Sequence, residues 1–479
     1  MSALWTGEAM IAAMGGRPLG QLPATVSGIS IDSRTLEPGE AFFAIKGEKF
    51  DGHDFATAAM AAGAGLLVVA EGRLPGLGRL TRPMIVVDDV LKALEKLAVA
   101  ARVRSKAKIV AVTGSAGKTT TKEALRRALS ATGSVHAAER SFNNHWGVPL
   151  TLARLPEDAD FGVFEIGMNH AGEIRPLVKL VRPHVAIVTV IAAAHLGHFH
   201  SLDDIARAKA EIFEGVEAGG HALINRDDQR WRILKKLAAD AKVAHIHGFG
   251  EHARADYKLL QCNLKGDHST ITARIGGEEV YARIGAPGRH IVQNALAVLG
   301  AAHLAGADVA RAAAALGGFA AEKGRGARHR LAHPDGAITV IDESYNANPA
   351  SMRAAIALLE RTEIGAGGRR IAVLGDMLEL GSHSKKLHAG LAEAITEAKL
   401  DRVYLAGEAM AALRDALAQQ VEVEYREKRE DLAPVLVAGV KGGDAVMIKS
   451  SLRLGFAKLV EALTEKYPAE GQEMAAHEE

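Results

Sequence analysis

A glycine-containing loop between a predicted strand and a predicted helix constrains this chain more than any other feature. Residues 109–121 read IVAVTGSAGKTTT, in which the apolar run 109–112 predicts a buried strand. Residues 122–131 then carry leucine and alanine at helical spacing. Backbone N–H groups at a helix start bind anions, so Lys118 would reach a phosphate and the Thr119 hydroxyl would bind Mg²⁺. The sequence therefore predicts a phosphate-binding loop, formed by Gly114, Gly117, Lys118, Thr119 and Thr120.

The loop departs from the strict phosphate-loop pattern G-x-x-x-x-G-K-[ST] at its first position. Val112 stands where that pattern has a glycine. A glycine turn that binds no ligand is the alternative interpretation, and it would account for the glycines. It would not account for a Lys-Thr pair at the start of a helix, which favours the phosphate loop.

Length and charge limit the architecture and the partners. The chain has 479 residues, which at about 100 to 200 residues per domain suggests three domains. Its 58 basic and 57 acidic residues nearly cancel and form no basic block, so we expect no nucleic-acid partner. Cys262 is the only cysteine, which is typical of a reducing cytoplasm. We expect neither a signal peptide nor membrane insertion, and we expect residues 468–479 to form a frayed polar tail.

Alternating strand and helix patterns predict an α/β protein with three domains, at residues 1–106, 107–318 and 319–479. The first is a small α/β unit, the second a parallel-sheet domain around the phosphate loop, and the third a Rossmann-like sheet. The predicted strands are 41–45, 66–69 and 84–87, then 109–112, 161–166, 185–190 and 222–224, then 338–341, 371–374, 403–406 and 445–448. The predicted helices include 55–62, 90–104 and 202–214.

Polar side chains in the predicted central domain suggest a metal site. Glu165 ends an apolar strand, where a Mg²⁺ held by Thr119 would supply the partner that a buried carboxylate needs. A strand-end glutamate with ordinary hydrogen bonds is the alternative. His195 could complete the metal site, but His198 and His200 lie close by, and spacing alone does not choose among them.

Further polar clusters lie in the first and third domains. Asp32, Ser33 and Arg34 follow a short apolar stretch and could bind a phosphorylated or sugar-like ligand, although the residues alone favour an ordinary surface turn. In the third domain, polar residues follow three strands of one predicted sheet, which three independent turns would hardly explain. These are the segment DESYNANP at 342–349, Asp376, and Lys449 with Ser450.

Taken together, the motifs resemble those of the ATP-dependent Mur ligases of peptidoglycan synthesis, over nearly the whole chain. The matching segments include VTGSAGKTTTKE, NNHWGVPLTL, EIGMNHAGEI, RAKAEIF, GRHIVQNALA, IDESYNANPASM and VLGDMLELG. The resemblance implies an amide ligase that uses ATP and Mg²⁺ to add D-alanyl-D-alanine to UDP-N-acetylmuramoyl-tripeptide through an acyl phosphate. It implies a cytoplasmic monomer, and it fits either diaminopimelate or lysine as the third residue of the acceptor peptide.

The resemblance also implies a role for each matching residue. Asp32, Ser33 and Arg34 would bind the uridine diphosphate, and Asn143 and Asn144 would lie beside the phosphates and the peptide. Glu165 and His195 would bind Mg²⁺, while Lys209, by itself a solvated helix lysine, would be carbamylated to hold a second Mg²⁺. His290 and Asn294 would contact the nucleotide. The third domain would supply Arg325, Asp342, Tyr345 and Asn346 to ATP and Lys449 to the incoming substrate.

The chain departs from the family pattern at two positions, and other functions stay open. Ile291 stands where many relatives have asparagine, and Ser450 stands where glycine is usual. The alternatives are a different Mur ligase, a folylpolyglutamate synthetase-like ligase, or a nucleotide switch that hydrolyses ATP without ligation.

Overall fold

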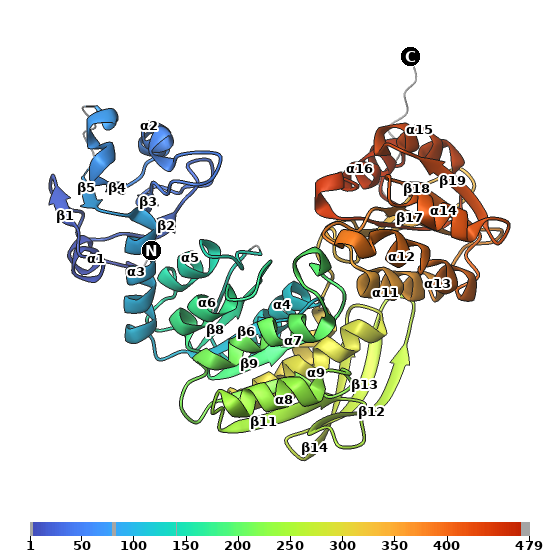
Figure 1. Ribbon diagram of the computed structural model, residues 1–479, viewed down its shortest axis with the longest axis horizontal. Helices are drawn as coiled ribbons and strands as arrows, with labels where there is room; N and C mark the ends of the chain where they lie inside the picture. The colour runs from blue at the N-terminus through green and yellow to red at the C-terminus, as the bar shows by residue number, and fades with distance from the viewer. Residues whose placement is uncertain (1–2, 79–82, 140, 471–479) are drawn as a thin grey trace.

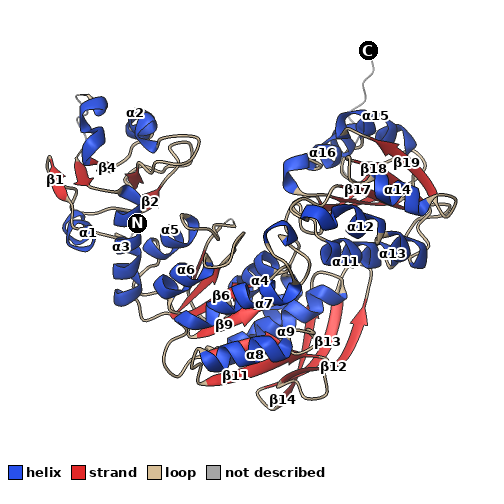
Figure 2. Ribbon diagram, viewed as in Figure 1, coloured by secondary structure: helices blue, strands red, loops and turns tan. Residues whose placement is uncertain are grey.

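The computed structural model describes residues 3–78, 83–139 and 141–470. Within these residues the strands form three sheets, each built from a separate stretch of the chain. The N-terminal and C-terminal sheets lie at opposite ends of the central one (Figure 1; Figure 2). The predicted α/β architecture with parallel strands is confirmed. No helix in the described part of the chain has both the length and the apolar character needed to cross a membrane.

The N-terminal sheet has the strand order β1-β5-β4-β3-β2. The pairs β5–β4, β4–β3 and β3–β2 are parallel, whereas β1 runs antiparallel to β5. The predicted helix at 55–62 is slightly shorter than expected, because Phe55 belongs to a preceding 3₁₀ turn and the helix ends at Ala61. The elements are α1 (Gly7–Met14), β1 (Arg17–Leu19), β2 (Ile29–Ser30), β3 (Ala41–Phe43), η1 (Gly52–Phe55), α2 (Ala56–Ala61), β4 (Leu66–Ala70), η2 (Glu71–Leu77) and β5 (Met84–Val87).

Helix α3 (Val90–Arg104) joins the N-terminal sheet to the central domain (Figure 1). Asp89 caps its start, because the Asp89 carboxylate accepts the Lys92 N–H at 2.9 Å and so satisfies one unpaired donor of the first turn. Its other end is anchored by Arg102, which donates to the carbonyl oxygens of Val181 and Arg182. The predicted helix 90–104 is therefore confirmed, and it fixes the N-terminal unit to helices of the central domain.

The central sheet has the order β14-β13-β12-β11-β10-β9-β6-β8-β7. Strand β6 (Lys108–Thr113) lies between β8 (Phe161–Glu165) and β9 (Val185–Val188) and is parallel to both. It is buried beyond Lys108, as expected of a parallel strand that is covered on both faces. The carboxyl ends of these strands therefore meet at one edge of the sheet, where ligands of such folds bind.

The prediction of an all-parallel central sheet is wrong for its far edge. The strands run parallel from β7 to β12, but β12, β13 and β14 form an antiparallel meander. Their hydrophobic residues alternate with polar ones, because one face of this part of the sheet is covered and the other is not. The hairpin between β12 and β13 reaches toward the C-terminal domain, where Gly266 lies beside Glu363 (Figure 1).

The remaining central elements follow the predicted order with adjusted ends. The predicted helix 202–214 ends at Ala210 and continues as a 3₁₀ turn, and the predicted strand 185–190 ends at Val188. The elements are α4 (Lys118–Ser130), β7 (Val135–Ala137), α5 (Gly147–Ala153), α6 (Ile174–Val181), η3 (Leu196–His198), α7 (Leu202–Ala210), η4 (Glu211–Gly215), β10 (His221–Asn225), α8 (Trp231–Asp240), β11 (His245–Gly250), β12 (Tyr257–Leu264), β13 (Ser269–Ile275), β14 (Glu278–Ile284), α9 (Arg289–Leu304), α10 (Val309–Ala315) and η5 (Leu316–Gly318).

The C-terminal sheet has the order β15-β16-β20-β17-β18-β19 and is parallel except for β15. The predicted strands are confirmed as β16, β17, β18 and β20, and the adjacency of β16, β20 and β17 places their carboxyl ends side by side. The elements are β15 (Ala327–Leu331), β16 (Ile338–Glu343), α11 (Pro349–Glu360), β17 (Arg370–Gly375), η6 (Gly381–His383), α12 (Ser384–Ala389), α13 (Ala392–Glu397), β18 (Arg402–Ala406), α14 (Ala411–Leu417), β19 (Glu422–Arg426), α15 (Arg429–Gly439), β20 (Ala445–Lys449), η7 (Leu452–Leu454) and α16 (Ala457–Lys466).

The first residues of the predicted frayed tail are in fact held in place. Ala469 forms an antiparallel bridge with Leu331, and the carboxylate of Glu470 pairs with Arg330 at 2.5 Å. Residues 468–470 are therefore held against β15, while the rest of the predicted tail, 471–479, lies outside the described residues.

Candidate active site

The loop between β6 and α4 needs glycine at two positions. Gly117 has φ +81° and Gly114 has φ +155°, both in the region that side chains other than glycine rarely adopt. A Cβ on Gly114 would lie 1.8 Å from the Thr189 hydroxyl, and one on Gly117 would lie 2.8 Å from Asn294. The loop therefore passes close to β9 and to α9, and the first turn of α4 opens toward the carboxyl edge of the sheet.

A carboxylate lies beside this loop, at the end of β8. Glu165 accepts a hydrogen bond from the Thr119 hydroxyl at 2.8 Å and another from the Asn143 amide at 2.7 Å. Glu165 and Thr119 are 3% exposed, so the carboxylate is held among polar partners away from bulk water. The predicted neighbours Thr119 and Glu165 thus come together, with Asn143 as a third member.

The C-terminal domain closes over the loop from the opposite side. The Asn348 amide donates to the Ser115 carbonyl at 3.2 Å, and Arg325 donates to the Ser141 hydroxyl at 3.2 Å. The guanidinium of Arg325 also lies 3.9 Å from the ring centre of Tyr345, which fixes its plane. Two domains therefore supply neighbouring side chains at this edge.

These groups enclose a cavity of about 550 Å³, called the central cavity below. Predicted residues that line it, from both domains, are Gly117, Lys118, Thr119, Thr120, Asn143, Glu165, His195, His290, Asn294, Arg325, Tyr345, Asn346 and Lys449. Gly114 contributes through its carbonyl oxygen, which accepts the Lys118 ammonium at 3.0 Å. A cavity of this size matches a nucleotide-sized ligand.

Positive charge gathers beside the central cavity, where Lys118 belongs to the described lining and the nearby Lys209 does not. Burial lowers the pKa of Lys118, an effect that Glu165 opposes and Arg325 strengthens. Lys209, on α7, is 1% exposed, and burial together with the Lys118 ammonium lowers its pKa well below the usual range. The alternative interpretation of Lys209 as a solvated helix lysine is therefore wrong, because α7 turns this side chain inward.

Three histidines lie in the loop after β9. His195 lines the central cavity, whereas His198 and His200 are exposed and absent from its described lining. The His195 ring lies 2.5 Å, between Nδ1 and Oε2, from Glu379 of the C-terminal domain. Burial lowers the pKa of His195, Glu379 raises it, and Lys118 and Lys209 lower it further. The tertiary structure thus brings His195, and neither of the other two, to the described lining of the central cavity.

Asp342 has a different place from the one expected. It is fully buried and accepts hydrogen bonds from the Gly324 N–H, the Ser344 N–H and the Ser344 hydroxyl. It therefore braces the turn that carries Tyr345 and Asn346, and it is absent from the described lining of the cavity. Asp376 likewise accepts the N–H groups of Ala409 and Met410.

Lys449, at the end of β20, does line the central cavity. Its ammonium donates to Glu343 at 2.9 Å and to the Asn346 carbonyl at 3.0 Å. The neighbouring Ser450 is fully buried, with its hydroxyl turned to the Ser451 carbonyl at 3.2 Å. The side chain that replaces the usual glycine therefore points into the domain.

Sequence reasoning missed one wall of the central cavity. Asn225, Asp227, Asp228 and Gln293 line it, next to His290, Asn294 and Ile291. Asn225 ends β10, so the rule that ligands bind at the carboxyl ends of parallel strands could have found this segment. Asn348 belongs to the predicted segment 342–349, but its contact with Ser115 was not predicted, because Ser115 lies in a different domain.

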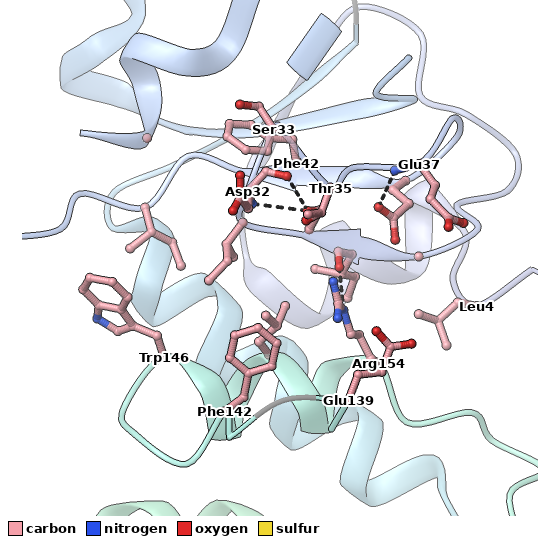
Figure 3. Close-up of a pocket in the computed structure, with 18 of the residues that line it drawn as sticks. Leu4, Asp32, Ser33, Thr35, Glu37, Phe42, Glu139, Phe142, Trp146 and Arg154 are labelled. Atoms are coloured by element: carbon pink, nitrogen blue, oxygen red, sulfur yellow. Dashed lines mark hydrogen bonds between the residues drawn. The ribbon is translucent and has the colours of Figure 1, made fainter. Parts of the chain in front are cut away.

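The predicted substrate residues Asp32, Ser33 and Arg34 line a separate cavity of about 1670 Å³, called the N-terminal cavity below (Figure 3). Arg34 forms a two-pronged pair with Asp32, at 2.9 and 2.7 Å. In Figure 3 Asp32 and Ser33 lie across the cavity from Phe142 and Trp146, which come from the central domain. Arg154 spans the two units, donating to the Ile29 carbonyl at 2.6 Å.

The two cavities approach each other at neighbouring residues of the chain. Asn143 lines the central cavity, whereas Asn144 lines the N-terminal cavity. Asn144 also accepts the Gly147 N–H at 2.9 Å and so fixes the start of α5. A ligand in the N-terminal cavity could therefore extend past this segment toward Lys118.

The side chains of the central cavity that could bind a metal ion do not form a cluster of histidines and carboxylates. Among the residues that the structure describes, no three His, Cys, Asp or Glu side chains lie together as a ready metal site. The oxygen donors here are a hydroxyl, a carboxylate and a carboxamide, which suit a hard cation that keeps water or phosphate ligands.

Comparison with known proteins assigns the family. The models described as Mur ligase family, catalytic domain, Mur ligase middle domain, and Mur ligase, glutamate ligase domain match residues 25–128, 112–302 and 324–452. The UDP-N-acetylmuramoyl-tripeptide--D-alanyl-D-alanine ligase of Escherichia coli is 35% identical over 92% of this chain and 94% of its own.

Solved structures are similar to this chain over nearly its full length. MurF from Acinetobacter baumannii has a TM-score of 0.83 and 30% identity, covering 96% of this chain and 99% of that one. MurF ligase from Thermotoga maritima in complex with ADP has a TM-score of 0.75 and 25% identity, covering 92% and 97%. Because sequence and fold agree over more than nine tenths of its length, the chain belongs to the Mur ligase family.

Proposed function

We propose that this chain catalyses the ATP-dependent addition of D-alanyl-D-alanine to UDP-N-acetylmuramoyl-tripeptide, giving the UDP-N-acetylmuramoyl-pentapeptide, ADP and phosphate. The observation that carries the proposal is the likeness, over more than nine tenths of the chain, to a ligase named for this reaction. The ADP complex of the Thermotoga maritima relative, which has the same fold, supports a nucleotide in the central cavity.

The central cavity supplies what phosphoryl transfer from ATP requires. We assign residues 114–120 as a phosphate loop, supported by the left-handed glycines and by Lys118 at the start of α4. Lys118 and Arg325 would neutralise the phosphate charge, a task of positioning and electrostatics more than of covalent chemistry. His290 and Asn294, one turn apart on α9, would hold the nucleoside.

Thr119 and Glu165 fit a magnesium ion, since both are buried oxygen donors that already face each other. His195 and Lys209 complete the proposed set, the lysine as a carbamate on its Nζ. Only a neutral amine adds CO₂, and a buried lysine beside another ammonium favours the neutral form. When bound, magnesium would shield the negative charge of the nucleotide phosphates.

The arrangement of cavities supports the order of the chemistry. With the uridine diphosphate near Asp32, Ser33 and Arg34, the peptide would pass Asn144 and Asn143 to the phosphate loop. Its terminal carboxylate would attack the γ-phosphorus to give an acyl phosphate and ADP. The amine of D-alanyl-D-alanine would then attack the acyl carbon, losing a proton as phosphate departs.

Each part of the chain takes one role in this proposal. Residues 1–106 bind the UDP-linked substrate, and residues 107–318 bind ATP. Residues 319–479, with a Rossmann-like sheet, would bind D-alanyl-D-alanine near Lys449. Monomeric state and a cytoplasmic location remain predictions.

The test is phosphate release from ATP in the presence of UDP-N-acetylmuramoyl-tripeptide, with and without D-alanyl-D-alanine. We expect release to require both substrates, and we expect Lys118→Ala to lower kcat by roughly 10²–10³-fold. Lys179→Ala, an exposed lysine on α6, is the matched control and should be neutral. Release that ignores both substrates would indicate a nucleotide switch, and a requirement for a different amino acid or for a folate would indicate another ligase.

A further inference from the structure

Two loops from different domains meet beside the central cavity. The loop after β9 carries His195, and the loop after β17 carries Glu379. Their side chains approach to 2.5 Å, and the Gly197 N–H donates to the backbone carbonyl of Glu379 at 2.8 Å. The turns η3 and η6 pack against each other at this point. The contact therefore joins backbone to backbone as well as side chain to side chain.

Both partners hold an unusual backbone conformation. His195 has φ +60° and Glu379 has φ +64°, a region that costs residues other than glycine about 1 kcal/mol or more. The approach is close, since a Cβ on Gly381 would lie 3.0 Å from the Cα of Gly197. Strain of this kind persists where the surrounding contacts determine the conformation, and here each loop is held by the other.

An ordinary surface ion pair is the alternative, and such pairs contribute about 0–1 kcal/mol. The observations favour a more specific role. The side chains of His195 and Glu379 are 22% and 36% exposed, and His195 lines the central cavity with Lys118. A carboxylate on one ring nitrogen fixes the tautomer and leaves the other nitrogen as a directed acceptor.

We infer that Glu379 is a positioning residue of the C-terminal domain, which orients the His195 ring and fixes its Nδ1–H tautomer when that domain is docked. The expected effect of Glu379 on turnover rests on the proposed function, whereas the orientation of the His195 ring does not depend on it. Because the pair crosses the domain boundary, the docking of the C-terminal domain controls a side chain of the central domain. His195 is then presented to the cavity only when both domains are in place.

Two measurements on the full chain test this inference. The first is steady-state kinetics of Glu379→Ala and Glu379→Gln against Glu397→Ala, an exposed glutamate on α13 of the same domain. We expect Glu379→Ala to lower kcat about 10- to 100-fold with little change in KM for the UDP-linked substrate. The glutamine variant should recover part of this loss, because its side-chain oxygen still accepts from Nδ1–H. Glu397→Ala should match the parent.

The second measurement is nitrogen NMR of histidine-labelled protein without substrates, with the His195 signal assigned by its loss in His195→Ala. We expect the Nδ1–H tautomer in the parent and a mixture in Glu379→Ala, while the thermal midpoint shows that the variant is folded. An unchanged tautomer, or unchanged kcat despite a changed tautomer, would overturn the inference. If the parent shows no ligase turnover, the proposed function is wrong. The tautomer seen by NMR would still test whether Glu379 orients the His195 ring.

Discussion

At the scale of single residues, Lys209 is where burial changes the chemistry most. It is 1% exposed and its pKa lies well below the usual range, because of burial and of the Lys118 ammonium. If it acts as a carbamate, Lys209→Ala should lose most activity and a small carboxylate such as acetate should restore part of it. Lys209→Arg should remain inactive, because a guanidinium keeps the positive charge and cannot add CO₂.

The readout is phosphate release at saturating substrates over a series of acetate concentrations. Lys236→Arg, on the exposed face of α8, serves as the control for the substitution itself. Full activity of Lys209→Arg would mean that the site needs only a cation, and the carbamate proposal would then be abandoned.

At the scale of elements, the start of α11 links local stability to the nucleotide loop. Asn348 caps this helix, accepting the Ser351 N–H at 2.9 Å, and its amide donates to the Ser115 carbonyl in the other domain. Asn348→Ala should lose both contacts, which costs about 0.5–2 kcal/mol for the cap. Asn348→Asp should keep the cap, since aspartate is an equally good capping residue, but it lacks the N–H donor.

The two variants therefore separate the two roles of Asn348. In urea unfolding we expect only the Asn348→Ala variant to be less stable than the parent. In calorimetry we expect both Asn348→Ala and Asn348→Asp to bind an ATP analogue more weakly. ATP-analogue affinity that stays normal in the stable Asn348→Asp variant would show that the contact with Ser115 does not matter for the nucleotide.

At the scale of the whole molecule, partly buried histidines of the central domain make stability depend on pH. Burial lowers the pKa of His184 to about 4, and its Nδ1 accepts the Ile109 N–H at 2.9 Å, which requires the unprotonated nitrogen. The pKa of His136 is also lowered by burial to about 4. Between pH 6.5 and 4 the unfolded chain binds protons that the folded chain does not, so stability is lost as pH falls through this range.

We expect the free energy of unfolding in urea to decrease from pH 7 to pH 5, with His184 contributing about 1–2 kcal/mol after allowance for its partial exposure. His184→Gln should remove that part of the pH dependence, whereas His200→Gln, exposed in the same domain, should leave it unchanged. A His184→Gln curve parallel to that of the parent would show that this histidine does not carry the effect.

The sequence by itself determined the features that depend on local physics. Within residues 109–131, an apolar run predicts the strand β6, and glycines that can adopt a left-handed φ predict the loop. Helical spacing of apolar residues then predicts the start of α4. Burial on both faces makes parallel strands such as β17 and β20 almost wholly apolar, so their order along the chain could be predicted.

Only the tertiary structure decided which distant segments meet. The antiparallel meander β12 to β14 was missed because pairing direction depends on neighbours in space, and β1 and β2 are too short to carry a pattern of their own. The same applies to the site. Spacing in the sequence could not distinguish His195 from His198, nor show that Asn348 and Glu379 contact residues of another domain. Hydrogen bonds act over about 3 Å whatever the separation in sequence, and the fold alone brings such groups within that distance.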